Sequence, residues 1–154
     1  MGYCRGLTLL LGIAYLQHWE QWLYCLVPVL FVFAITMISQ GEVHGNNRRN
    51  IALAGCLYVF VIFYVSILNQ KTAMPLVFQL PFFLLFAIMV LLPLVKAYQV
   101  NTPLNIKKAV KAGVVSIVIL DATMAVAHTN VGYALAILLL FPLAIGLAKL
   151  FAVT

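Results

Sequence analysis

Residues that can bind an anion or a metal ion are concentrated in one short segment, residues 41–50, which we call the polar decapeptide. It holds Glu42, one of three acids in the chain, together with one of three histidines and two of nine basic residues. A carboxylate can hold a hard cation such as Mg²⁺, which usually bridges to substrate phosphates. Arginine grips phosphate oxygens with a planar fork of donors. The segment therefore predicts a site for a phosphorylated ligand, and the alternative is a solvated loop whose arginines only set the topology.

The residues assigned to this predicted site comprise one metal ligand and six ligand-binding side chains. The metal ligand is Glu42, and the ligand-binding residues are Arg5, His44, Asn46, Asn47, Arg48 and Arg49.

Asp121 is a second candidate, because it interrupts an apolar run. An acid inside a membrane span is costly and is a functional hypothesis by default. It lies 15 residues beyond Ile106, which is about 22 Å along a helix. We therefore expect Asp121 near the outer face, in a site separate from the polar decapeptide. The alternative is a structural acid that joins helices through Thr123 or Ser116.

The chain that carries these residues is almost entirely apolar. It is 66% hydrophobic and 8% charged, with a mean hydropathy of +1.13, so it lacks the charged side chains that cover a soluble domain. Its composition indicates an integral membrane protein with a single transmembrane domain, residues 1–154. The net charge of +6 does not indicate a nucleic-acid partner, because the basic residues lie mainly at the ends of apolar runs, where they orient helices.

The apolar runs predict an all-α, polytopic transmembrane bundle. A bilayer core of about 30 Å needs about 20 helical residues. Five full spans are expected, at residues 22–39, 50–68, 74–98, 106–128 and 132–151, with a short N-terminal helix at 3–16. Residues 69–73 are expected to form a loop. Thr102 and Pro103 predict the cap and first residue of the helix that follows, and the small residues Ala109 and Gly113 predict close helix packing.

The distribution of charge predicts an orientation. If Met1 faces the cytoplasm, outer loops carry only Lys71, whereas the inner segments carry most of the basic residues, as the positive-inside rule requires. Both termini and the polar decapeptide are then cytoplasmic in a bacterial-type inner membrane. The residues on the inner side are Arg5, Arg48, Arg49, Lys96, Lys107, Lys108 and Lys111.

Four short segments together resemble the UbiA superfamily of intramembrane prenyltransferases, specifically the divergent UbiA-like branch associated with bacterial ebo-type operons. They are CRGLTLLLG at 4–12, SQGEVHG at 39–45, LDA at 120–122 and LFAVT at 150–154. The resemblance implies a helical bundle around a central cavity, in which Mg²⁺ and acidic loops hold a prenyl diphosphate while its isoprenoid is transferred to an acceptor. It places the second acidic motif of the family at Glu42, where Asn46 occupies the position of a further acid.

The first acidic motif of that family is absent from this sequence, which implies that the chain is the C-terminal portion of a UbiA-like bundle. The remaining helices would come from upstream sequence or from a partner chain. Three functions stay open: a prenyltransferase acting within the membrane, a non-catalytic membrane subunit or isoprenoid-lipid binder, and a small transporter module that uses Asp121.

Overall fold

The computed structural model describes residues 2–15, 19–41, 48–70 and 75–150, and all of its regular structure there is helical. This confirms the predicted all-α class. The helices, in chain order, are α1 (Gly2–Tyr15), η1 (Trp19–Cys25), α2 (Leu26–Ser39), α3 (Arg48–Gln70), α4 (Leu76–Gln99), α5 (Pro103–His128) and α6 (Val131–Leu150).

Four stretches of helix among the described residues are long and apolar enough to cross a bilayer: Trp22–Ser39, Arg48–Gln70, Val77–Gln99 and Pro103–His128. They support an integral membrane protein and match four of the predicted spans. The predicted N-terminal helix is present as α1, which has 14 residues. The predicted fifth span falls on α6, whose described apolar stretch, Val131–Leu143, is shorter than the other four, so a fifth crossing stays a prediction.

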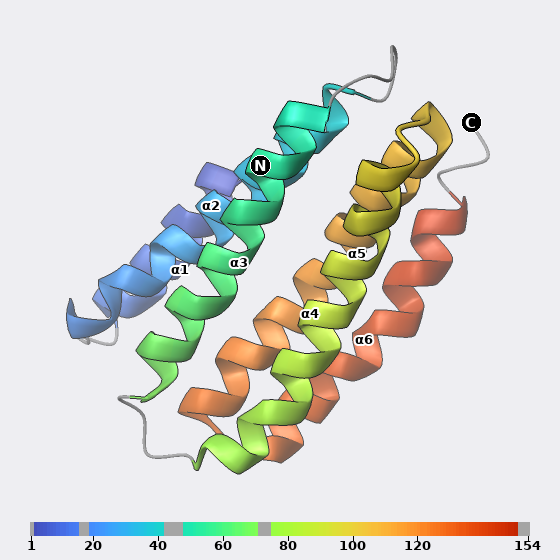
Figure 1. Cartoon of the computed structure of the whole chain (residues 1–154). Coiled ribbons are helices and arrows are strands. Elements are labelled where there is room, and N and C mark those ends of the chain that lie inside the picture. Colours follow the sequence, from blue (N-terminus) through green and yellow to red (C-terminus); the bar gives the residue numbers. More distant parts are fainter. Residues whose placement is uncertain (1, 16–18, 42–47, 71–74, 151–154) are drawn as a thin grey trace.

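Helix α5 occupies the centre of the bundle (Figure 1), because it packs against α2, α3, α4 and α6. Helices α1, α2 and α3 lie on one side in that view, and α4 and α6 lie on the other. Eleven residues of α5 are buried. Asp121 also belongs to this helix, and its side chain is 39% exposed.

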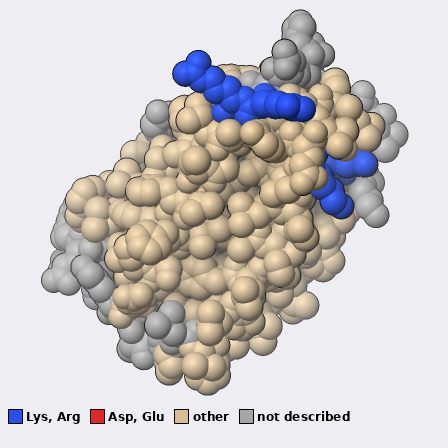
Figure 2. Space-filling model, viewed as in Figure 1, with Lys and Arg blue, Asp and Glu red and all other residues tan. Residues whose placement is uncertain are grey.

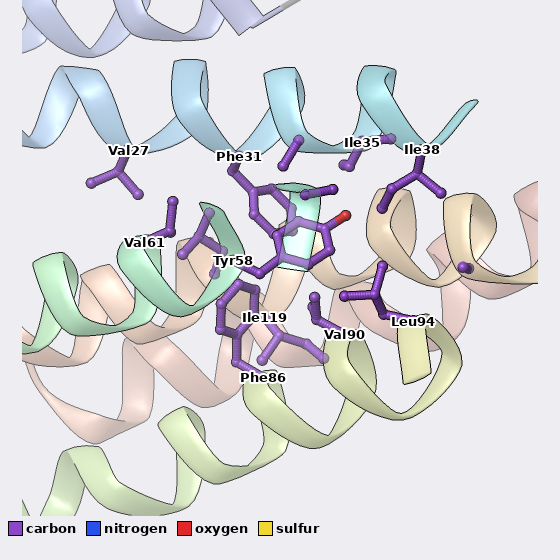
Figure 3. Close-up of a cluster of buried hydrophobic side chains, with 14 of the residues drawn as sticks. Val27, Phe31, Ile35, Ile38, Tyr58, Val61, Phe86, Val90, Leu94 and Ile119 are labelled. Carbon is purple, nitrogen blue, oxygen red and sulfur yellow. The ribbon is translucent and has the colours of Figure 1, made fainter. Parts of the chain in front are cut away.

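The core forms around three aromatic rings from three helices, as Figure 3 shows. The ring of Phe31 on α2 lies 5.2 Å from that of Tyr58 on α3 and 5.4 Å from that of Phe86 on α4, centroid to centroid. These are the separations at which aromatic pairs attract one another. Gly113 of α5 faces Ile35 and the Tyr58 hydroxyl, each 3.0 Å from where a Cβ would lie. The predicted close packing at Gly113 is therefore confirmed.

Helix α5 begins where the sequence predicted, with Thr102 at the N-cap and Pro103 as the first helical residue. The backbone N–H groups of Asn105 and Ile106 both donate to the Thr102 carbonyl, although the Thr102 side chain makes no capping bond. The predicted loop at 69–73 is wrong at its start, since α3 continues to Gln70 and Asn69 is fully buried. Asn69 stays helical because it has hydrogen-bond partners inside the bundle.

Basic side chains gather at one end of the bundle, which we call the basic end (Figure 2). It is formed where α3 begins, α4 ends and α5 begins, three points that antiparallel packing brings together (Figure 1). Its described members are Arg48, Arg49, Lys96, Lys107, Lys108 and Lys111. Of the Lys and Arg side chains that the structure describes, only Arg5 lies elsewhere.

Candidate functional site

A cavity of about 470 Å³ lies between α1, η1 and α5. Helix α5 lines it with residues at the spacing of a single helical face, and α1 does the same from the other side. The lining residues are Arg5, Thr8 and Leu9 from α1, Tyr24 from η1, and Asp121, Met124, Ala125 and His128 from α5. This volume is within the range of sites that bind small molecules.

An ion pair forms one part of the lining of this cavity. Nη2 of Arg5 donates a hydrogen bond to Oδ2 of Asp121. The two side chains are 41% and 39% exposed respectively, so each still faces open space. A guanidinium carries five N–H donors, and the bond to Asp121 leaves others for a ligand in the cavity.

Along α5, the pair lies away from both helix ends. Arg5 is ten residues from the Tyr15 end of α1 and Asp121 is seven residues from the His128 end of α5, or about 15 Å and 10 Å along the helices. Pro103, at the basic end, is 18 residues from Asp121, or about 27 Å. Asp121 therefore lies away from the basic end, and the structure pairs it with Arg5, which the sequence had assigned to the other site.

The alternative reading of Asp121 named the wrong partners. The hydroxyl of Thr123 donates to the Ile119 carbonyl at 2.7 Å, and that of Ser116 donates to the Gly113 carbonyl at 2.8 Å. Both bonds lie within α5, because a short hydroxyl side chain reaches the carbonyl one turn earlier more easily than a neighbouring helix. The partner of Asp121 comes from α1 instead.

Behind the cavity, a chain of hydrogen bonds fixes η1 against α3 and α5. The Tyr24 hydroxyl donates to Oδ1 of Asn69 at 3.1 Å, and Nδ2 of Asn69 donates to the Thr123 carbonyl at 3.3 Å. The Tyr64 hydroxyl of α3 also donates to the Leu23 carbonyl at 3.3 Å. Buried bonds of this kind define one arrangement of the helices, since a buried polar group without a partner is costly. They hold the Tyr24 wall of the cavity in place.

His128 lies at the mouth of the cavity, at the last residue of α5. Its ring meets that of Tyr24 edge to face, with the centroids 4.8 Å apart. As the last residue of α5, His128 lies at a helix end and also lines the cavity. The spacing of Asp121, Met124, Ala125 and His128 could have indicated this shared face, since such residues lie on one side of a helix.

The polar decapeptide lies largely outside the described residues, and this covers Glu42, His44, Asn46 and Asn47. Arg48 and Arg49 open α3 and are exposed at the basic end. The structure therefore brings Arg5 to Asp121, but it does not describe whether the predicted decapeptide site forms.

Among the described residues, no three His, Cys, Asp or Glu side chains lie close enough together to hold a metal ion. Asp121 is the one acid whose side chain the structure describes, and it is engaged by Arg5. Mg²⁺ at Glu42 stays a prediction.

The fold and the cavity define a class: a helical membrane protein with a charged pocket inside its bundle. Comparison with known proteins adds no family, since no protein-family model, no curated protein and no solved structure matches this chain. The function must therefore be argued from the residues of the site.

Proposed function

We propose that this chain binds an isoprenoid diphosphate within the membrane, as part of a UbiA-like prenyltransferase. The observation that carries the proposal is the cavity between α1, η1 and α5, which combines one ion pair with apolar walls. A prenyl diphosphate has the same two parts, a charged head and an apolar chain.

In this proposal the head of the ligand binds to Arg5. Its free N–H donors suit phosphate oxygens, and a charge-assisted bond of this kind is strong in a water-poor site. Asp121 positions the guanidinium through their hydrogen bond. Leu9, Met124 and Ala125 supply the apolar surface for the first part of the isoprenoid chain.

Prenyl transfer needs more than binding. An acceptor carbon attacks C1 of the prenyl group while diphosphate leaves, and positive charge must offset the charge that develops on the leaving group. Arg5 can contribute part of that charge. Mg²⁺ would supply the rest, but no three His, Cys, Asp or Glu side chains lie together among the described residues. The described geometry therefore supports binding better than it supports transfer. A non-catalytic isoprenoid-lipid binder is the corresponding alternative.

Binding of a polyprenyl diphosphate to the purified chain tests the proposal, measured with and without Mg²⁺. The variant is Arg5→Gln with Asp121→Asn, which removes both charges and keeps polar side chains at both positions. We expect it to weaken binding at least ten-fold, because a charge-assisted contact contributes about 1.5–3 kcal/mol. Arg49→Gln, at the exposed basic end, is the control variant, because it removes a positive charge outside the cavity. It also tests whether the polar decapeptide contributes to binding.

Binding of the diphosphate head in the cavity and binding at the polar decapeptide predict opposite results for these variants. If Arg49→Gln or Glu42→Ala weakens binding and the double variant does not, the head binds at the polar decapeptide and the cavity proposal is wrong.

The apolar walls of the cavity are tested with Ala125→Leu, which fills the cavity. Its control is Ala136→Leu, at an exposed position of α6. Release of pyrophosphate in the presence of an acceptor distinguishes an enzyme from a binder.

A second candidate is a transporter module, favoured by the position of Asp121 inside a span and facing a cavity. An intramembrane acid paired with a base is a common element of ion pathways. Proton flux into vesicles that contain the purified chain, compared with flux for Asp121→Asn, tests this candidate. Equal flux would remove its main support.

We further propose that the basic end faces the cytoplasm of a bacterial-type inner membrane. The support is the gathering of basic side chains at that end (Figure 2), where α3 begins, α4 ends and α5 begins, together with the positive-inside rule.

A further inference from the structure

Two lysines from neighbouring helices share a small hollow at the basic end. Lys96 comes from the last turn of α4 and Lys108 from near the start of α5. The hollow has a volume of about 250 Å³, and Leu92, Pro93 and Asn105 complete its lining. None of these residues lines the cavity that contains Arg5, so this is a separate site.

The charge of the hollow is not compensated by the described residues. Neither lysine has an ion-pair partner among them, and the nearest described acid along α5, Asp121, is 13 residues beyond Lys108 and already paired. The N-terminal end of α5 adds a partial positive charge, since its first N–H groups point out of the helix. The hollow therefore favours an anion.

The rim of the hollow is held in place. Nδ2 of Asn105 donates to the Val100 carbonyl at 2.9 Å, which ties the side chain to the turn between α4 and α5. Asn105 and Lys108 are three residues apart and so share a face of α5, and Pro93 and Lys96 share a face of α4 in the same way. Two helix faces thus present both lysines to one space.

The apolar part of the lining lies deeper than the lysines. Leu92 is four residues before Lys96, about 6 Å further into the bundle, and it is 58% exposed. A phospholipid at a membrane surface has the same order, with its phosphate at the level of the charged groups and its acyl chains below. Basic pockets between membrane helices bind anionic headgroups for this reason.

We propose that this hollow binds an anionic phospholipid, whose phosphate lies between Lys96 and Lys108 and whose acyl chain packs on Leu92 and Pro93. The site does not depend on the function assigned to the cavity. A bound lipid would fasten α4 to α5 at the end where their connecting turn is exposed.

The full chain in nonionic micelles is titrated with short-chain phosphatidylglycerol, and the shift in unfolding temperature gives an apparent Kd. Lys96→Gln and Lys108→Gln should each weaken binding about five-fold, the effect of one lysine near an anionic headgroup. Lys107→Gln is the matched control, because this neighbouring exposed lysine does not line the hollow. Lys108→Arg keeps the charge and should retain binding.

Three results would overturn the proposal. Equal loss of affinity in Lys107→Gln would mean that only the overall charge matters. An equal shift with phosphatidylcholine of the same chain length would remove the need for an anionic lipid. An equal shift with inorganic phosphate alone would assign the hollow to the free anion, without any role for the acyl chain.

Discussion

The guanidinium of Arg5 on α1 donates a hydrogen bond to the carboxylate of Asp121 on α5, across 116 residues of sequence. It is the one ion pair among the residues that the structure describes. The bond attaches the N-terminal helix α1 to the central helix α5 and lies on the wall of the cavity of about 470 Å³. The two side chains that join α1 to α5 therefore also line the cavity.

Removing one partner should cost more than removing both. Arg5→Gln or Asp121→Asn alone leaves a charge inside the bundle, and we expect a loss of about 2 kcal/mol, between the values for exposed and buried pairs. The double variant should recover about half of that loss, because no unpaired charge remains. Unfolding by denaturant in micelles measures each step. Additive losses would contradict the pairing.

Two buried tyrosines provide a matched test of the polar network. The Tyr24 hydroxyl donates to Asn69, whereas the Tyr58 hydroxyl is buried without a partner among the described residues. Tyr24→Phe should lower the free energy of unfolding by about 1 kcal/mol, the usual net value of a hydrogen bond. Tyr58→Phe should be neutral or stabilising, since it removes an unsatisfied polar group. The reverse order would mean that Tyr58 has a partner in solution, such as a bound water.

The sequence predicted the elements of this fold well, because membrane spans are determined by length and composition alone. Four apolar stretches match the predicted spans closely, and the start of α5 follows from Thr102 and Pro103. The end of α3 was misplaced, because Asn69 is polar and polarity suggested a loop. Asn69 is buried because it hydrogen-bonds to Tyr24 and to the Thr123 carbonyl. These residues are distant in sequence, so the neighbours of Asn69 in the sequence do not predict the contacts.

The candidate site was predictable only in part. The depth of Asp121 follows from counting residues along one helix, but its partner depends on how α1 packs against the bundle. Arg5 was assigned by charge to the cytoplasmic side, because arginines usually lie there. In the structure it is paired with Asp121, apart from the other described basic residues. A pairing between residues 116 positions apart cannot be inferred from the local sequence.

Two glycines of α1 should respond in opposite ways to the same substitution. A Cβ at Gly6 would lie 2.9 Å from Cγ2 of Val29 and 3.1 Å from the Cys25 carbonyl, whereas nothing lies within 4 Å at Gly12. Gly6→Ala should therefore destabilise the protein by about 1–3 kcal/mol through overpacking. Gly12→Ala should be neutral, or stabilising by up to about 1 kcal/mol through helix propensity. Thermal unfolding in micelles compares them.

Val29→Ala should partly rescue Gly6→Ala, because the closest atom to the added Cβ is Cγ2 of Val29, which this substitution removes. The Cys25 carbonyl cannot be removed in this way, so the rescue should be incomplete. Equal stability of the two glycine variants would mean that α1 does not pack on α2 as closely as described.

The orientation of the bundle can be tested with single cysteines at its two ends. Gln99→Cys lies at the basic end and Asn130→Cys at the other, and both positions are exposed. Because positive residues favour the cytoplasmic side, a membrane-impermeant maleimide added to spheroplasts should label Asn130→Cys at once. It should label Gln99→Cys only after permeabilisation. The background replaces the native thiols through Cys4→Ser, Cys25→Ala and Cys56→Ser. Labelling in the opposite order would place the basic end outside, and with it the proposed phospholipid site.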